Sequence, residues 1–192
     1  MNAVLTILIG SIFVNNFAMS RFYGICPFLG VSKKLETAFG MGMAVTFVMA
    51  VASLVAYLVN TFLLIPLEIE YLQTIAFILV IAVLVQIVEM AIKKMSPGLY
   101  QALGVYLPLI TTNCCVLGAA ELNAKYDRGI LASTVFGLCS GIGFAIAVIL
   151  FASLRERLEI SKIPRPFQGA AIALITAGIL AMAFMGFSGL VK

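Results

Sequence analysis

Lys, Arg, Asp and Glu divide this chain into six long stretches that contain no charged side chain, and this division constrains the fold more than any other feature. As a helix rising ~1.5 Å per residue, each stretch is long enough to cross a hydrocarbon core of ~30 Å. None has the alternating pattern of a membrane β-barrel strand. The stretches are 1–20, 37–67, 71–88, 95–120, 129–154 and 166–191. We therefore expect an all-α integral membrane protein with six transmembrane helices.

The composition excludes several other classes of protein. Hydrophobic residues make up 63% of the chain and charged residues only 10%, which leaves too little polar surface to cover the core of a soluble enzyme. Four Cys among 192 residues are too few for a disulfide-stabilised scaffold. The shortage of charge also excludes an intrinsically disordered chain.

The distribution of basic residues predicts the orientation in the membrane. Nine of the 12 Lys and Arg lie in the loops after the first, third and fifth stretches: Arg21, Lys33, Lys34, Lys93, Lys94, Arg155, Arg157, Lys162 and Arg165. Basic residues of short loops are retained on the cytoplasmic side, so both termini are expected on the outer side. The basic residues form no stripe that would bind nucleic acid.

Two weak sequence matches indicate an internal repeat. Residues 26–30 and 114–118 share the pattern C-x-x-L-G, and residues 40–54 and 141–154 share G-x-G-x-A followed by A-S-L. The matches occur in the same order and would place three helices in each half, about 1–96 and 97–192. Because three is odd, the second half must be inverted in the membrane. The sequence therefore predicts one membrane domain, 1–192, built as an inverted 3+3 repeat.

Helices 1 and 4 are expected to be interrupted near the two repeat-related cysteines. Gly24, Pro27 and Gly30 surround Cys26, and Pro108 precedes Cys114. Backbone groups released by a break inside a bilayer need partners within the protein. Plausible partners are the side chains of Asn15, Asn16, Thr111, Thr112 and Asn113. The inverted symmetry predicts that Cys26 and Cys114 lie near the middle of the membrane.

A pair of cysteines held in this way suggests metal ligation, because iron–sulfur clusters are carried by Cys thiolates and a [2Fe–2S] cluster needs four ligands. Cys26 and Cys114 supply half of such a set. Cys115 points about 100° away from Cys114 on a helix, and Cys139 has no counterpart in the first half. We interpret those two as packing residues, which is the usual role of a membrane cysteine. The missing ligands would come from another chain.

Other polar and small residues favour structural roles. The Gly-x-Gly pairs at 40–42 and 141–143 lie in apolar stretches with no preceding strand, so they indicate close helix packing rather than a dinucleotide site. Glu89 and Lys93, four residues apart, predict a local ion pair at the membrane interface. Glu121 lies near the outer end of its stretch, and its role stays open.

Several long strings of residues are similar to those of a known family, the RnfA subunits of Rnf electron-transport complexes, and the resemblance covers almost the whole chain. They are VNNF at 14–17, GICPFLGVSKKLETA at 24–38, LPLITTNC at 107–114, RERL at 155–158, ALITAG at 173–178 and FMGFSG at 184–189. The related NqrE protein of sodium-pumping NADH:quinone reductases looks similar but typically differs around the first cysteine.

The resemblance implies a membrane subunit of an ion-translocating ferredoxin:NAD+ oxidoreductase in the cytoplasmic membrane of a prokaryote. Such a chain pairs with the homologous RnfE subunit, which has the opposite topology, and the two enclose a [2Fe–2S] cluster. Cys26 and Cys114 match the family's ligand positions, and Gly24, Pro27, Thr112 and Asn113 are expected to surround them. Cys115 departs from the small apolar residue usual at its position.

The same resemblance implies that the chain has no catalytic residues or independent activity. It would assemble with RnfE and with the B, C, D and G subunits, contact ferredoxin and NAD+ only indirectly, and couple electron transfer to movement of Na+ or H+. The ion pathway is not identified by any pattern in the sequence.

Three alternative functions stay open at this point. An ion or small-solute carrier could also use an inverted repeat with broken helices, but six of the eight acidic residues lie in loops, and only Glu89 and Glu121 lie near helix ends. A scaffold protein with inert cysteines is the second alternative. The equivalent component of a sodium-pumping NADH:quinone reductase is the third.

Overall fold

The computed structural model describes residues 10–14, 16–32, 34–67, 70–95, 98, 100–101, 108–126, 129–161 and 164–186. Within these residues all regular structure is helical, as the charge-free stretches predict. The first half contains η1 (Gly10–Val14), α2 (Ile25–Val31), α3 (Leu35–Val59), η2 (Asn60–Leu64), α4 (Ile65–Leu67), η3 (Glu70–Leu72) and α5 (Gln73–Met95). The second half contains α7 (Pro108–Thr111), α8 (Cys114–Tyr126), α9 (Ile130–Ile160), η5 (Arg165–Phe167) and α10 (Ala170–Met185).

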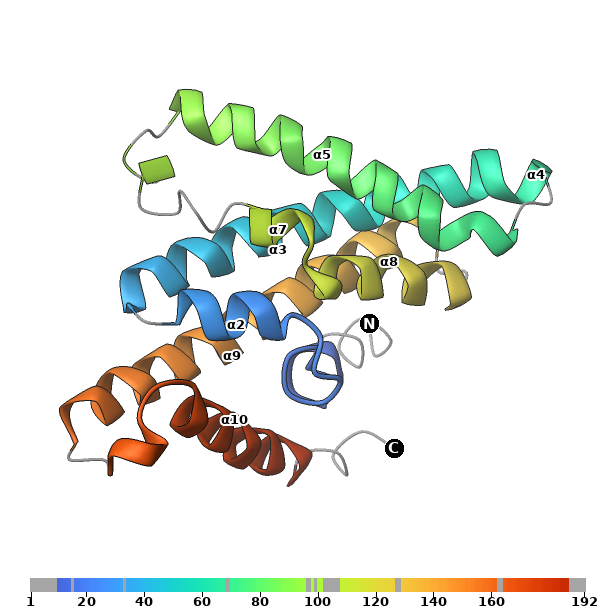
Figure 1. The fold of residues 1–192 in the computed structure, drawn as a ribbon. Coiled ribbons are helices and arrows are strands. Elements are labelled where there is room, and N and C mark those ends of the chain that lie inside the picture. Colours follow the sequence, from blue (N-terminus) through green and yellow to red (C-terminus); the bar gives the residue numbers. More distant parts are fainter. Residues whose placement is uncertain are drawn as a thin grey trace.

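Helices α3 and α9 form the centre of the molecule and pack closely along much of their length (Figure 1). A methyl group added at Gly42 would lie 2.9 Å from Cβ of Ala145, and one added at Gly141 would lie 2.7 Å from Cα of Thr46. Residue numbers rise along α3 as they fall along α9, so the two helices are antiparallel. The predicted packing role of the glycine pairs is therefore confirmed for Gly42 and Gly141.

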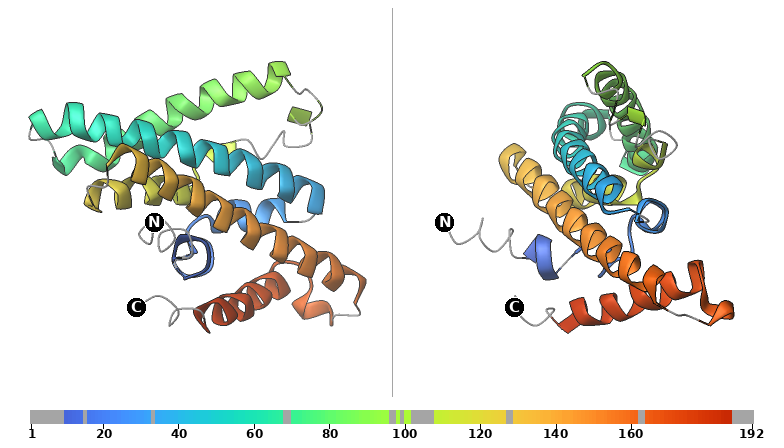
Figure 2. Two further views of the ribbon diagram at one scale, coloured as in Figure 1. Left: turned by 180° about the vertical axis from the view of Figure 1, so that it is seen from behind. Right: turned by 90° about the vertical axis from the view of Figure 1, so that its left-hand side faces the viewer.

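The remaining helices are arranged around this pair. Helix α8 contacts both α3 and α5, and α10 lies against α9 on the opposite side of the molecule from α5 (Figures 1 and 2). Three apolar side chains of α5, Phe77, Ile81 and Val85, are buried against the core. The opposite face of α5 exposes Ile75, Ile78, Leu79, Val83, Ile87 and Met90. Such an apolar outer face suits contact with lipid or another membrane protein.

Three of the described helical segments are long and apolar enough to cross a bilayer: Leu35–Leu64, Gln73–Lys94 and Ile130–Ile160. They contain most of the predicted spans 37–67, 71–88 and 129–154. Helix α10, within the predicted span 166–191, has 16 residues, fewer than the ~20 that a straight crossing needs.

The stretches 1–20 and 95–120 are not continuous helices where the structure describes them. The stretch 1–20 contains η1 and a turn, and its residues 1–9 and 15 lie outside the described part. The stretch 95–120 contains the short α7, a break and the start of α8. The hydropathy of a segment indicates whether it prefers lipid or water. Whether its helix is continuous depends instead on local breakers such as Pro108 and on side chains that replace the lost backbone hydrogen bonds.

Close packing of α3 and α9 predicts that Gly137→Ala destabilises the fold. The new methyl group would lie 2.7 Å from the Met49 carbonyl oxygen and against the side chain of Ser53, and backbone cannot easily move away. We expect a loss of about 1–3 kcal/mol in the free energy of unfolding, measured by denaturation in detergent micelles.

The matched control is Gly178→Ala in α10, where an added Cβ meets no heavy atom within 4 Å. Alanine is the better helix former, so this variant should keep or raise stability by up to ~1 kcal/mol. Equal effects of the two substitutions would contradict the role assigned to the α3–α9 contact.

Candidate site at two helix breaks

Asn16 holds the turn that follows η1. Its Nδ2 donates hydrogen bonds to the carbonyl oxygens of Gly143, at 2.8 Å, and Ile12, at 3.1 Å, while its Oδ1 accepts one from the Ala18 N–H. The side chain is 1% exposed. Asn16 therefore satisfies backbone groups on both sides of the break, as the sequence predicts, and ties the turn to α9; Asn15 lies outside the described residues.

The backbone of this turn takes an unusual course immediately before α2. Gly24 has φ 79°, in the left-handed region that glycine enters without steric cost. A Cβ at this position would lie 2.8 Å from Sγ of Cys115 and 2.9 Å from Oδ1 of Asn113. A larger residue would thus clash with the second half of the chain as well as strain the backbone.

The second break separates α7 from α8. Thr112 Oγ1 and the Thr112 N–H both donate to the Pro108 carbonyl oxygen, at 3.1 and 3.2 Å. Asn113 Oδ1 accepts the Cys115 N–H at 3.0 Å, which is the standard side-chain cap of a helix that begins at Cys114. The side chain of Asn113 is buried, whereas Thr112 is exposed.

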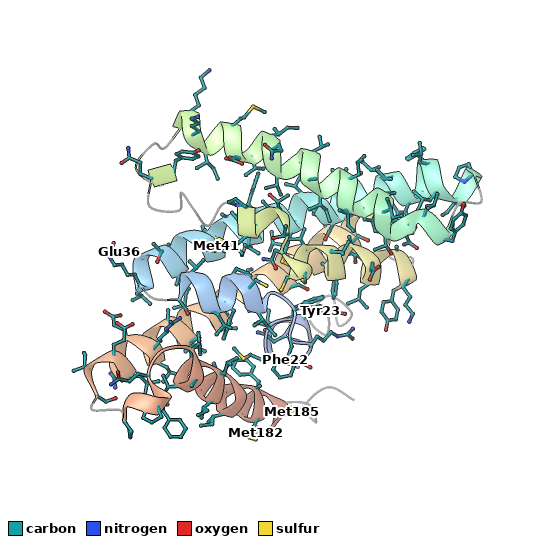
Figure 3. All side chains as sticks on the ribbon, in the orientation of Figure 1. Phe22, Tyr23, Glu36, Met41, Met182 and Met185 are labelled. Atoms are coloured by element: carbon teal, nitrogen blue, oxygen red, sulfur yellow. The ribbon has the colours of Figure 1, made fainter. Side chains whose placement is uncertain are left out.

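The two breaks lie against each other. Cys115 Sγ donates to the Tyr23 carbonyl oxygen at 3.0 Å, and the ring of Tyr23 packs where a side chain at Gly118 of α8 would be (Figure 3). Cys26, the second residue of α2, follows shortly after Tyr23 in the sequence. Cys114, the first residue of α8, directly precedes Cys115. Both are exposed free thiols on the surface of this chain.

The other two cysteines are buried in the helical core. Cys115 is 0% exposed and uses its thiol to hold Tyr23, and Cys139 in α9 is 1% exposed. A thiol that donates to a carbonyl carries its proton, which is not the state of a metal ligand. The structure thus separates the adjacent sulfurs of Cys114 and Cys115 by exposure and by hydrogen bonding.

One feature of Asn113, the residue before Cys114, fits a nearby acceptor such as a metal-bound sulfur. The Asn113 Nδ2 amide is buried and has no hydrogen-bond partner in the described part of the chain, so it can donate to an additional acceptor such as a sulfur atom. No group of three or more His, Cys, Asp or Glu that could hold a metal occurs among the described residues. Pro27 has no N–H and its ring is buried, so it contributes packing only.

Arg155, which the sequence pattern marks only as a topology signal, also binds oxygen atoms at the end of α2. Its Nη1 donates to the Leu29 carbonyl oxygen at 2.7 Å and to Ser32 Oγ at 3.0 Å. The guanidinium thus binds the carboxyl end of α2, where a cation is favourable. In the sequence, Arg155 is distinguished by its position at the end of an apolar stretch, within RERL.

The charged pair predicted in α5 takes a different form. The Lys93 ammonium lies 5.6 Å from the centre of the Tyr100 ring, and the described residues show no ion pair between Lys93 and Glu89. Cation–π contact with an aromatic face replaces the predicted local pair. Glu121 accepts a hydrogen bond from Thr74 Oγ1 at 2.9 Å and thereby joins α8 to α5.

Comparison with known proteins identifies the family of this chain. Residues 4–191 match the family model described as "Rnf-Nqr subunit, membrane protein". A relative from Actinobacillus pleuropneumoniae, named as the A subunit of an ion-translocating oxidoreductase complex, is 59% identical over 186 residues, which cover 97% of this chain and 96% of the relative.

Proteins of the same name show similar identity over full length. The one from Pseudoalteromonas translucida is 57% identical over 192 residues, and the one from Sodalis glossinidius is 55% identical over 192 residues; each match covers 100% of both chains. The resemblance seen in the sequence is confirmed, and the chain belongs to the Rnf-Nqr family of membrane subunits.

Proposed function

We propose that this chain is the RnfA-type membrane subunit of an Rnf complex and carries electrons across the membrane through a [2Fe–2S] cluster that it shares with the homologous RnfE subunit. The observation that carries the proposal is the exposure of the Cys26 and Cys114 thiols on two segments that meet at the Cys115–Tyr23 hydrogen bond. The chain acts as part of a redox-driven translocase, in agreement with the name of its relatives, and needs no catalytic residue of its own.

Two features of the site support a cluster ligated by these thiols. Cys114 is the first residue of α8, the end of the helix at which the helix dipole favours a nearby negative charge. Asn113, capped onto the same helix end, has a buried amide left to donate. The cluster would supply one-electron transfer within the membrane, and these residues would hold its sulfur ligands and stabilise their charge.

The order of elements supports an inverted repeat with interrupted first and fourth spans. Each half consists of a short helical turn, a break, a helix beginning at or next to a cysteine, a long central helix and a further apolar helix. The long helices α3 and α9 are equivalent in this order, and they are antiparallel, as an inverted pair must be. We place both termini on the outer side of a bacterial cytoplasmic membrane, because basic residues concentrate on the other side.

A partner chain is required by the count of ligands. A [2Fe–2S] cluster takes four, and this chain offers two exposed thiols. A homologous protein of opposite topology, RnfE, would present the equivalent pair. The B, C, D and G subunits would then connect this site to ferredoxin and NAD+, with Na+ or H+ as the coupled ion.

Ligation by Cys26 and Cys114 predicts that Cys26→Ser and Cys114→Ser each remove one [2Fe–2S] signal from the intact complex. Serine replaces the thiolate with a weakly acidic hydroxyl that iron binds poorly. The measurement is low-temperature EPR of the purified complex, with iron and sulfide analysis and subtraction of the other clusters. Iron content should fall by about two atoms per complex if the site is lost.

Cys115→Ser is the control, because it keeps a small hydrogen-bonding group against Tyr23 while changing a neighbouring sulfur. It should retain the full signal. Unchanged spectra in all three variants would leave inert cysteines and support a scaffold or carrier, and loss only in Cys115→Ser would assign the ligand to the buried sulfur.

Asn113→Asp tests the role of the buried amide. The aspartate can still accept the Cys115 N–H, but it cannot donate and it adds negative charge. Fewer hydrogen bonds and more negative charge near a cluster stabilise its oxidised form, so the midpoint potential should become more negative while the iron content is kept. Redox titration followed by EPR measures this shift, and an unchanged potential would remove Asn113 from the site.

If electrons pass through this chain, loss of a cluster ligand should abolish electron transfer and ion uptake together. In vesicles containing the complex, Cys26→Ser should reduce both ferredoxin-dependent NAD+ reduction and the accompanying uptake of Na+ or H+ to background. Parallel measurement with each ion identifies the coupled one. Ion uptake that continues at the normal rate without electron transfer would instead support an independent carrier.

A further inference from the structure

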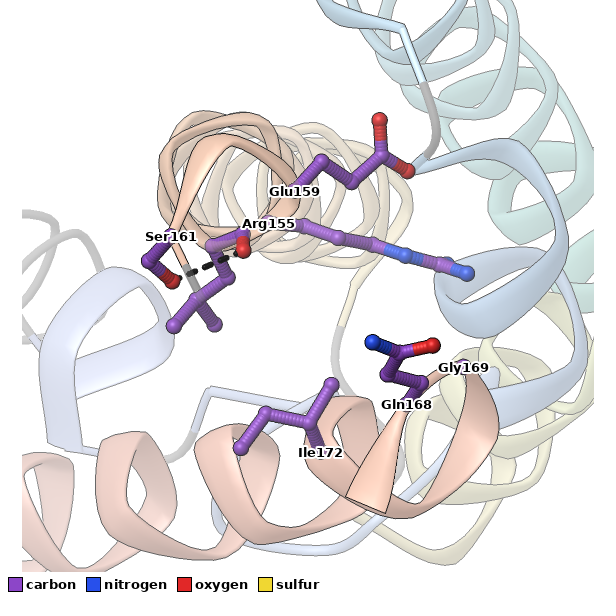
Figure 4. Close-up of a pocket in the computed structure, with 7 residues that line it drawn as sticks. Arg155, Glu159, Ser161, Gln168, Gly169 and Ile172 are labelled. Carbon is purple, nitrogen blue, oxygen red and sulfur yellow. Dashed lines mark hydrogen bonds between the residues drawn. The ribbon is translucent and has the colours of Figure 1, made fainter. Parts of the chain in front are cut away.

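A cavity of about 290 Å³ lies between the end of α9 and the start of α10 (Figure 4). Its polar lining comes from Arg155, Glu159, Ser161 and Gln168, and Ile172 lines it from α10. Ser161 Oγ is already committed, since it donates to the Leu158 carbonyl oxygen at 2.9 Å. Arg155 and Glu159 give the cavity one positive and one negative side chain.

A second cavity of about 110 Å³ lies further along α10. Its lining is apolar and includes Phe22, Phe28 and Leu29 from the first half together with Leu174, Ala177 and Gly178 from α10. A Cβ added at Gly178 would meet no heavy atom within 4 Å, so the space beside this residue is open. Its size and lining suit part of a hydrocarbon chain.

One hydrogen bond links the linings of the two cavities. Leu29 lines the apolar cavity, and its carbonyl oxygen accepts a hydrogen bond from Arg155, which lines the polar cavity. Along α10, Ile172 and Gly178 are six residues apart, or ~9 Å of helix. The two linings thus approach each other at this hydrogen bond, and their separation along α10 is one that an amphiphile can span.

We propose that these cavities together bind a diacyl phospholipid with a phosphoethanolamine head group. Within the described part of the chain, both hydrogen bonds from Arg155 use Nη1, which leaves Nη2 and Nε to donate to a phosphate, the anion whose geometry a guanidinium matches. The Glu159 carboxylate accepts the primary ammonium. One acyl chain follows α10 into the apolar cavity, beside Phe22 and Gly178.

The position of the site in the chain agrees with a lipid ligand. Arg155 immediately follows the charge-free stretch 129–154, so the cavity lies where α9 leaves the hydrocarbon core. Pockets between membrane helices on the basic side of a protein are typical places for lipid head groups. Among the described lining residues, one acid, Glu159, opposes one base, Arg155, and this pairing favours a zwitterionic head group over an anionic one.

The test is photolabelling of the intact complex in vesicles that contain trace lipid with a diazirine in the acyl chain. Three probes are compared: phosphatidylethanolamine, phosphatidylcholine, whose trimethylated amine cannot donate a hydrogen bond, and phosphatidylglycerol, which has no amine. Labelled peptides are mapped by mass spectrometry. We expect labelling of residues 170–185 by phosphatidylethanolamine to exceed that by either other lipid several-fold.

Two variants separate the head-group contact from the acyl-chain contact. Glu159→Gln should bring labelling by phosphatidylethanolamine down to that by phosphatidylcholine, and Gly178→Leu should reduce labelling by all three probes because it fills the apolar cavity. The matched control is Ala183→Leu, an exposed position of the same helix outside both cavities, which should leave the pattern unchanged.

Equal labelling of wild-type residues 170–185 by the three probes would overturn the proposal, since it indicates nonselective lipid contact. Absence of label there, while the exposed face of α5 is labelled, would show that another part of the complex covers the cavities and would also overturn it. Loss of the [2Fe–2S] signal is not expected in Glu159→Gln or Gly178→Leu, so this test is independent of the proposed electron carrier.

Discussion

Every backbone polar group inside a hydrocarbon layer must find a partner within the protein, and this requirement organises the part of the molecule that carries Cys26 and Cys114. Where the chain breaks, Asn16 binds two carbonyl oxygens and one N–H, and Asn113 caps α8. Each asparagine thus replaces the helical hydrogen bonds that a break removes. The breaks can then bring thiols at helix ends to the surface while these backbone groups keep partners within the protein.

The central helices make that arrangement possible because they can approach closely. Gly42, Gly137 and Gly141 allow α3 and α9 to pack with little space between their backbones, and Gly143 admits the Ile12 backbone of η1. Membrane helices gain no hydrophobic free energy by leaving lipid for each other, so close van der Waals contact is their main source of association. Gly143, which also accepts a hydrogen bond from Asn16, therefore fixes the first break against α9, next to the glycines that pack the central pair.

The features that depend on composition and spacing could be predicted from the sequence. An all-helical membrane chain, the long helices around 37–67 and 129–154 and the structural role of Asn16 all follow from apolar runs, glycine pairs and local breakers. The contact between the two breaks could not be derived in this way, because Gly24, Asn113 and Cys115 meet only through tertiary packing. Arg155 was missed for the same reason: its partners Leu29 and Ser32 are more than one hundred residues away in sequence.

Arg155 connects the two sites that we propose. Its guanidinium holds the carboxyl end of α2, and Cys26 lies in the first turn of that short helix, so one bond network positions the segment on which the thiol is placed. The stacked rings of Phe28 and Phe151, 4.1 Å between centres, fix the same helix against α9. A phosphate bound to the free edge of the guanidinium would compensate its charge at the membrane boundary without competing for Nη1. The lipid would then stabilise the arginine in the orientation that α2 already requires.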